Sequence, residues 1–211
     1  MRSNHLVPAP ASPATLVALA AGRSDYGPLV RAGAVLFVTA LTAAAAQVSV
    51  PLPFTPVPFT LQPMIVLLGG AALGSRLGLA SQVLYLAAGL AGLPVFAASP
   101  LLPQGAARLL GPTGGYLMSY PLAAFAAGWL AERRFDRRYL TSVLAMAAGL
   151  AIIFTCGVLW LGILMPGPGG LGPALSAGLL PFLPADIVKL LLAAAVLPRI
   201  WRFTGPGRHG S

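Results

Sequence analysis

Residues 140–165 read LTSVLAMAAGLAIIFTCGVLWLGILM, and this stretch contains no Asp, Glu, Lys or Arg. A helix needs roughly 20 mostly apolar residues to cross the hydrocarbon core of a bilayer. The charge-free run extends from Tyr139 to Ala185, and three more such runs cover residues 32–75, 77–107 and 109–131. Each run can hold one or two spanning helices, so the sequence predicts an integral membrane protein.

The composition supports this class. Of the 211 residues 57% are hydrophobic and only 8% are charged, whereas soluble domains carry about 25% charged residues. The net charge of +9 is explained by basic residues that flank membrane spans, which argues against a nucleic-acid-binding protein. The only cysteine is Cys156 and the only histidines, His5 and His209, lie in the tails. A disulfide framework and an imidazole-based metal or catalytic site are therefore not expected.

The expected fold is an all-α membrane protein with six transmembrane helices. The predicted spans are residues 29–49, 61–75, 77–95, 114–132, 140–165 and 181–200. Breaks between them are marked by Pro and Gly, as in VPLPFTPVPFTLQP at 50–63, which holds five prolines and cannot form one continuous helix. Gly- and Pro-rich segments at 99–115 and 165–173 mark two further loops.

The basic residues predict the orientation. With six spans and the N-terminus inside, eleven arginines are cytoplasmic and only Arg108 is external, which obeys the positive-inside rule. The eleven are Arg2, Arg23, Arg31, Arg76, Arg133, Arg134, Arg137, Arg138, Arg199, Arg202 and Arg208. Both termini are therefore expected to be cytoplasmic.

Three segments follow from this topology. Residues 1–28 form a flexible or surface-lying cytoplasmic tail, residues 29–202 the transmembrane domain and residues 203–211 a second cytoplasmic tail. The apolar stretch PATLVALAAG at 13–22 is too short to span, and its alternative interpretation is the core of a signal peptide. The loops at 50–60 and 96–113 face outward and are expected to form the lid of a binding site that opens to the outside.

Two ionisable side chains lie inside the predicted membrane region. Asp186 and Lys189, in PFLPADIVKLLLAAAV at 181–196, are three residues apart and share one helix face near the outer end of the sixth span. Ionisable groups at such depth are candidates for function, although the two could also form a neutralising pair that only fixes helix packing. A carboxylate beside an ammonium suits a ligand with an anionic end and N–H donors.

Other candidates surround this pair. The glycines of GPTGGY at 111–116, Gly114 and Gly115 among them, leave backbone N–H groups at a helix start, where an anion or carbonyl could dock; a plain helix cap is the alternative. Polar residues expected near the outer face are Thr55, Thr60, Gln62, Gln82, Tyr85, Gln104 and Tyr116. For Arg108, binding of a lipid phosphate is slightly favoured over contact with a ligand.

Several catalytic and nucleotide-binding motifs are missing from the sequence. It contains no G-x-x-x-x-G-K-[ST] loop, no G-x-S-x-G elbow and no H-E-x-x-H. An enzyme is not expected, because one Asp and one Lys provide little acid–base machinery. Energy for transport would have to come from a partner or from an ion gradient.

Four motifs in this order resemble the BioY family, the biotin-binding S components of energy-coupling factor (ECF) transporters. They are VPLPFTPVPFTLQ at 50–62, YLAAGLAGLPVFA at 85–97, GPTGGYL at 111–117 and PFLPADIVK at 181–189, and the resemblance covers roughly residues 30–200. It implies a six-helix bundle that takes up biotin across a prokaryotic plasma membrane. It also implies a membrane coupling protein and two ATPases as partners, so that ATP is bound only by a partner. One departure is Ala185, where the family more often has Gly.

The resemblance also implies roles for individual residues. Lys189 would pair with the biotin carboxylate, Asp186 would accept the ureido N–H groups, and Phe59, Tyr85 and Tyr116 would flank the rings. The remaining predicted binding residues are Thr60, Gln62, Gly114 and Gly115, and no metal or cofactor is expected. The small residues Ala40 and Ala44, four apart on the first span, match the position that contacts the coupling protein. The alternative function is an ion-coupled secondary transporter of a small carboxylate-bearing solute, with Asp186 as proton carrier.

Overall fold

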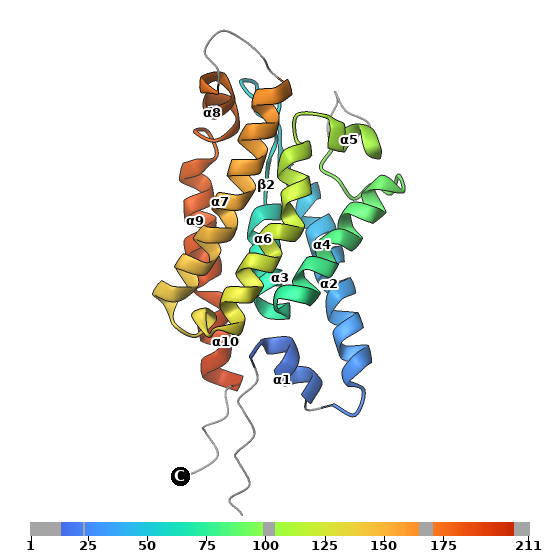
Figure 1. Ribbon diagram of the computed structural model, residues 1–211, viewed down its shortest axis with the longest axis vertical. Coiled ribbons are helices and arrows are strands. Elements are labelled where there is room, and N and C mark those ends of the chain that lie inside the picture. Colours follow the sequence, from blue (N-terminus) through green and yellow to red (C-terminus); the bar gives the residue numbers. More distant parts are fainter. Residues whose placement is uncertain (1–13, 23, 99–103, 165–170, 205–211) are drawn as a thin grey trace, which may run out of the picture.

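The computed structural model describes residues 14–22, 24–98, 104–164 and 171–204, which form a bundle of helices (Figure 1). Its longer helices are α2 (Gly27–Gln47), α3 (Gln62–Leu73), α4 (Ser75–Leu90), α6 (Gly114–Glu132), α7 (Tyr139–Leu164) and α9 (Leu183–Ala194), which α10 (Val196–Thr204) continues. The shorter elements are α1 (Leu16–Gly22), the strands β1 (Ser49–Val50) and β2 (Phe59–Thr60), α5 (Ala106–Leu110), the 3-10 helix η1 (Phe135–Arg137) and α8 (Gly172–Gly178). The expectation of a helical fold is confirmed.

Each of the six ranges predicted to span the membrane is largely covered by a helix. The starts follow simple chemistry: α2, α3, α8 and α9 each have Pro in their first two positions, where its fixed φ suits a helix and no hydrogen bond is lost. Helix α4 ends at Leu90, five residues before the predicted end of its span, and Gly92 follows in the left-handed region with φ +87°. Glycine adopts that conformation without strain.

Length and composition single out fewer membrane spans than the sequence predicts. Helices α2 and α7 are long and apolar enough to cross a bilayer, and α8 with Leu183–Thr204 passes as a third span that is bent by 51°. Among the shorter apolar helices of the described residues is α3, with 12 residues. Six crossings and the positions of the termini relative to the membrane stay predictions.

Helix α6 lies at the centre of the bundle, against α3, α4 and α7 (Figure 1). Glycines permit the close approach of α3 and α4 to α6. A Cβ atom on Gly128 would lie only 2.5 Å from the backbone nitrogen of Ser75, and one on Gly70 would lie 2.7 Å from the Cα atom of Ala124. The α3–α4 break at Gly74, whose φ is +90°, therefore packs backbone to backbone against α6.

The two predicted outer loops contain regular structure. Strands β1 and β2 pair antiparallel, with Ser49 opposite Thr60 and Val50 opposite Phe59, so residues 49–60 form a hairpin. Residues 104–113 contain α5, and residues 99–103 lie outside the described residues. The hairpin, α5 and α8 lie at one end of the bundle, here called the hairpin end, and α1, η1 and α10 lie at the other, here called the tail end (Figure 1).

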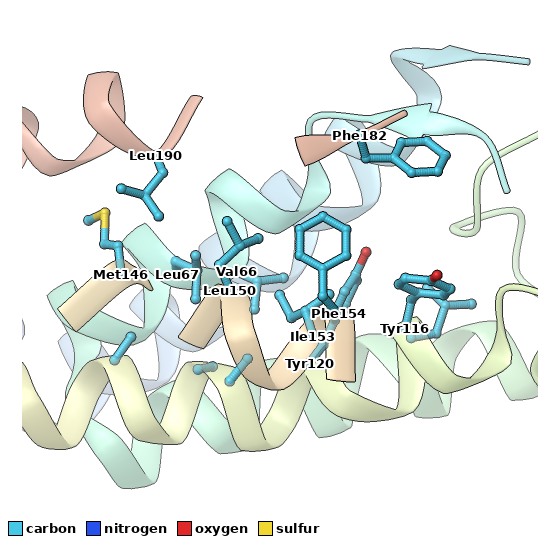
Figure 2. Packing of buried hydrophobic residues seen from close by; sticks show 14 of the residues in the cluster. Val66, Leu67, Tyr116, Tyr120, Met146, Leu150, Ile153, Phe154, Phe182 and Leu190 are labelled. Atoms are coloured by element: carbon cyan, nitrogen blue, oxygen red, sulfur yellow. The ribbon is translucent and has the colours of Figure 1, made fainter. Parts of the chain in front are cut away.

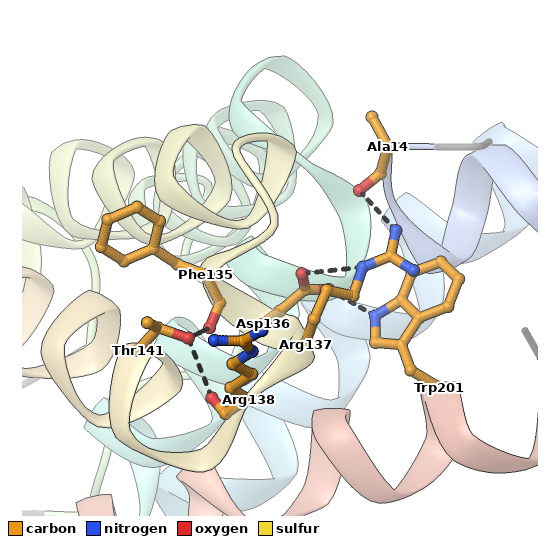
Figure 3. A network of polar contacts seen from close by, with 7 residues as sticks. All are labelled: Ala14, Phe135, Asp136, Arg137, Arg138, Thr141 and Trp201. Atoms are coloured by element: carbon orange, nitrogen blue, oxygen red, sulfur yellow. Dashed lines mark hydrogen bonds and ion pairs between the residues drawn. The ribbon is translucent and has the colours of Figure 1, made fainter. Parts of the chain in front are cut away.

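A polar network ties the tail end together (Figure 3). Asp136, only 1% exposed, accepts a hydrogen bond from Trp201 Nε1 and forms an ion pair with Arg137 at 3.3 Å. The Arg137 guanidinium stacks 3.2 Å above the Trp201 ring and donates to the carbonyl of Ala14 at 3.5 Å. These contacts hold η1, α10 and the segment before α1 in fixed positions. Helix α1 itself buries Val17 and Ala21; its predicted place at a membrane surface stays a prediction.

Candidate functional site

The Asp186–Lys189 pair lies in the first turns of α9, and both side chains are buried. The two form an ion pair, as their spacing of three predicts. Lys189 Nζ also donates to the backbone carbonyl of Thr60 at 2.7 Å and lies 4.0 Å from the centre of the Phe59 ring. Strand β2 and α9 are therefore joined through one ammonium group.

The side chain of Gln62, at the start of α3, is held by a second polar contact. Its Nε2 donates to the hydroxyl of Tyr85 at 2.6 Å, and that hydroxyl donates to the carbonyl of Val95 at 3.2 Å. The Tyr85 ring meets Phe96 edge-on, with 5.5 Å between the ring centres. Tyr85 is completely buried, and its contacts position Gln62 and Phe96.

Several of these residues border a cavity at the hairpin end. Its aromatic lining consists of Phe59, Phe96, Tyr116, Tyr120, Phe154 and Phe182, and its polar lining of Thr60, Gln62, Arg108, Thr113, Asp186 and Lys189. Figure 2 shows the rings of Phe182, Phe154, Tyr116 and Tyr120 gathered at one end of the core, with aliphatic side chains such as Leu190 and Met146 toward the other. An aromatic cavity with a few polar groups is typical of a small-molecule site.

The cavity measures about 60 Å³, which is room for a few water molecules. Its lining residues come from the hairpin, α3, α5, α6, α7 and α9, and hydrogen bonds hold α8 against two of these elements. Thr55 of the hairpin donates to the carbonyl of Ala177 in α8 at 2.7 Å, and Tyr116 of α6 donates to the carbonyl of Gly178 at 2.8 Å. A ligand larger than a few waters therefore requires these elements to move apart.

Six of the nine predicted binding residues line this cavity: Phe59, Thr60, Gln62, Tyr116, Asp186 and Lys189. Tyr85 does not, because it lies behind Gln62 and Phe96. Gly114 and Gly115 do not line it either: a Cβ atom on Gly114 would meet the carbonyl of Leu109 in α5, and one on Gly115 would meet Trp160 and the carbonyl of Cys156 in α7. The three lie beside the cavity in this structure, and their contact with a ligand stays a prediction.

Arg108 does not lie where the expected contact with a lipid phosphate would require. Its side chain, on α5, is only 2% exposed and lines the cavity, so it does not reach the phosphate of a surrounding lipid. Burial lowers the pKa of the guanidinium, because a cation loses its hydration there. An arginine remains protonated in this setting, and a buried cation beside a cavity favours an anionic group in that cavity.

Sequence reasoning missed part of the lining. Phe96, Tyr120, Phe154 and Phe182 lie in apolar stretches, where nothing distinguishes a residue that faces a cavity from one that faces the core. Thr113 Oγ1 is buried without a hydrogen-bond partner among the described residues, which makes it available to a ligand. Across the described ranges, no group of three or more His, Cys, Asp or Glu side chains is placed to hold a metal ion.

Ala40 and Ala44 lie away from this cavity. Both are exposed on α2 at the side of the bundle (Figure 1), next to exposed Phe37 and Leu41. The face is apolar and shallow, as a close helix contact requires.

A bundle of apolar helices that encloses an aromatic cavity with a buried ion pair defines the class of helical membrane proteins that bind a small solute. The solved structures include a similar one. A crystal structure of the S-component for biotin from an ECF-type ABC transporter superposes with a TM-score of 0.75 at 27% identity, over 85% of this chain and 94% of that one.

The family follows from the sequence comparisons. The BioY family model matches residues 23–205. The probable biotin transporter BioY of Pyrococcus horikoshii is 42% identical over 165 residues, 78% of this chain and 91% of that protein. The biotin transporter BioY of Thermotoga maritima is 38% identical over 172 residues, 82% of this chain and 94% of that protein. This chain belongs to the BioY family, which confirms the resemblance, and the family is one of transporters and not of enzymes.

Proposed function

We propose that this chain is the biotin-binding S component of an ECF-type transporter in the plasma membrane of a prokaryote. Family membership and the names of its relatives support the substrate. The observation that carries the proposal is the buried Asp186–Lys189 ion pair at the edge of an aromatic cavity. We place biotin in this cavity, under the hairpin and residues 96–113, on the outer side of the membrane.

The parts of biotin match the lining. Its ureido ring offers N–H donors, its fused rings and thioether are apolar, and its valerate ends in a carboxylate. Asp186 accepts the ureido N–H groups, Phe154 and Phe182 flank the rings, and Gln62 and Thr113 offer further hydrogen bonds. Each of these groups is buried, so its hydrogen bonds to the ligand are not screened by water.

The contacts of Lys189 change its expected role. An ammonium has three hydrogens, and Lys189 directs its own toward Asp186, the Thr60 carbonyl and the Phe59 ring. We infer that Lys189 holds the Asp186 carboxylate in position. We assign the carboxylate of biotin to Arg108, which approaches the cavity from α5, on the other side of the bundle from α9 (Figure 1).

We infer that entry of biotin requires the elements around the cavity to move apart, since the cavity of about 60 Å³ holds only a few waters. Energy comes from partner subunits: an ECF coupling protein and two ATPases, with ATP bound only by the ATPases. The exposed small residues Ala40 and Ala44 form the contact with the coupling protein.

Equilibrium binding of labelled biotin and of its neutral amide to the detergent-purified chain tests this assignment. Loss of a charge-assisted hydrogen bond costs about 1.5–3 kcal/mol, or roughly ten- to over a hundredfold in affinity. Arg108→Gln should weaken biotin by that factor and leave the amide unaffected. Asp186→Asn should weaken both ligands, and Arg76→Gln, which changes an exposed arginine on α4, should weaken neither. If Arg108→Gln weakens biotin and the amide equally, Lys189 would instead be assigned to bind the biotin carboxylate.

The ion-coupled alternative is less well supported. A proton carrier must change its charge during transport, and protonation of Asp186 would break its ion pair and leave the Lys189 ammonium buried without its carboxylate. Collapse of the proton gradient while ATP is maintained should leave biotin uptake intact. Immediate loss of uptake under that condition would favour the secondary transporter.

A further inference from the structure

A second concavity lies on the outside of the bundle, between α7 and α9 and bordered by α8. It is an open groove of about 650 Å³. On α7 its wall follows one helical row of residues four apart, Val143, Ala147, Ala151, Thr155 and Leu159. No charged residue of the described ranges lines it, so the groove is suited to a hydrocarbon.

The facing wall on α9 is another row of residues four apart: Leu183, Ile187 and Leu191. On α7 the lining extends over 16 residue steps, from Val143 to Leu159, which is about 24 Å of helix. Half of a bilayer's hydrocarbon core is about 15 Å deep. The groove is therefore long enough for a complete acyl chain, and small exposed Ala147 and Ala151 leave it room between the helices.

One end of the groove is basic. Tyr139 begins the α7 row, and its hydroxyl donates to the carbonyl of Leu191, a lining residue, at 3.4 Å. Arg138 precedes it, and Arg199 lies on α10, eight residues after Leu191 and beyond the break at Ala195. Both arginines are exposed.

No acidic residue lines the groove. Of the four acids in the sequence, Asp136 is paired with Arg137, Asp186 with Lys189, and Glu132 accepts hydrogen bonds from Ser75. The fourth, Asp25, precedes α2. The opposite end, at residues 171–183, carries no charge, so the cationic groups mark one end only.

We propose that this groove binds one acyl chain of an anionic phospholipid, whose phosphate lies against Arg138 and Arg199. An apolar channel with cations at one end complements a hydrocarbon tail with an anionic head. A second copy of the chain is the poorer occupant. In a membrane, two copies related by a twofold axis along the bilayer normal would bring the same arginines together at one level, and like charges repel. Phe154 lines both the groove and the cavity, so one side chain separates the two.

Native mass spectrometry of the purified chain with added phosphatidylglycerol or phosphatidylcholine tests the proposal. Wild-type protein should retain one phosphatidylglycerol preferentially. Ala151→Phe, which fills the groove, should remove that lipid, whereas Ala148→Phe, on an exposed position of α7 outside the lining, should keep it. Arg138→Gln with Arg199→Gln should weaken phosphatidylglycerol at least about tenfold and phosphatidylcholine less, and Arg76→Gln should change neither.

Two results would overturn the lipid site. One is equal retention of phosphatidylglycerol by wild type, Ala151→Phe and the double arginine variant. The other is a dimer of the wild type that Ala151→Phe dissociates, because the groove would then hold a second copy. The arginine changes are on exposed side chains, so they keep the test valid even if Ala151→Phe does not fold. Biotin takes no part in these measurements, and their outcome is therefore independent of the proposed function.

Discussion

At the scale of single residues, the ammonium group of Lys189 is held by two segments that lie far apart in the sequence. The spacing of three from Asp186 predicts the ion pair, because helical periodicity alone brings the two side chains together. The bond to the Thr60 carbonyl depends on how the hairpin folds over α9, and no local pattern encodes that. The same limit explains why Arg108 was misread: its burial is produced by α5 and its neighbours.

The ion pair predicts a specific pattern of stabilities. Removing one partner of a buried pair leaves an uncompensated charge and costs about 3–5 kcal/mol. Asp186→Asn and Lys189→Gln should each lower the free energy of unfolding by this order, measured in detergent without ligand. The double variant should lose less than the sum of the single losses, because no buried charge then remains. Additive losses would show that the two groups do not stabilise one another.

Asp136 predicts a pH dependence that belongs to the tail end (Figure 3). Burial raises the pKa of its carboxyl above the ordinary value of 3.8, against the opposing effects of Trp201 and Arg137. The folded chain therefore binds this proton more tightly than the unfolded chain, so stability is gained as pH falls through the folded pKa toward 3.8.

Thermal unfolding at a series of pH values compares the wild type with Asp136→Asn. Asparagine keeps an oxygen for the Trp201 N–H and removes the ionisation. Lowering the pH through the raised pKa of Asp136 toward 3.8 should raise wild-type stability relative to the variant. Parallel curves for the two proteins would contradict the assignment to Asp136.

At the scale of elements, the sequence predicts the helices well and the short elements poorly. Prolines in the first turns and glycines at the breaks mark helix boundaries chemically, so the long apolar segments could be placed to within a few residues. Strands β1 and β2 have two residues each, too few for an alternating pattern to be visible. Helix α5 is five residues long and lies in a Pro- and Gly-rich stretch, where only tertiary contacts stabilise it.

Variants of helix α2 should separate biotin binding from biotin transport. Ala40 and Ala44 are exposed, whereas Thr42 between them is completely buried and bonds within the bundle. Replacing both alanines with Leu should keep biotin binding by the isolated chain and impair assembly with the coupling module, because bulk prevents close helix contact. Uptake in cells and copurification of the module measure this. Replacing exposed Leu84 on α4 with Ala is the control, and normal uptake by the double leucine variant would place the partner elsewhere.

At the scale of the whole molecule, the arginines are distributed unevenly between the two ends of the bundle. The eleven arginines assigned to the cytoplasm include Arg133 and Arg202 at the tail end and Arg76 at the α3–α4 break, whereas Arg108 lies at the hairpin end. Composition predicts a cytoplasmic tail end, because basic side chains are retained on the cytoplasmic side during insertion, and this orientation stays a prediction. It could not predict the cavity, since the cavity depends on how α6, α7 and α9 converge on the hairpin.

The orientation itself is a prediction that single cysteines can test in a Cys156→Ser background. Ser176 of α8 and Arg133 after α6 are both exposed, one at each end of the bundle, and neither lines the cavity or the groove. With the hairpin end outside, an impermeant thiol reagent should label Ser176→Cys on intact cells and Arg133→Cys only after permeabilisation. The parent without added cysteine should remain unlabelled in both conditions. Labelling of Arg133→Cys alone on intact cells would show that the tail end faces outward. Biotin would then have to approach its cavity from the cytoplasm.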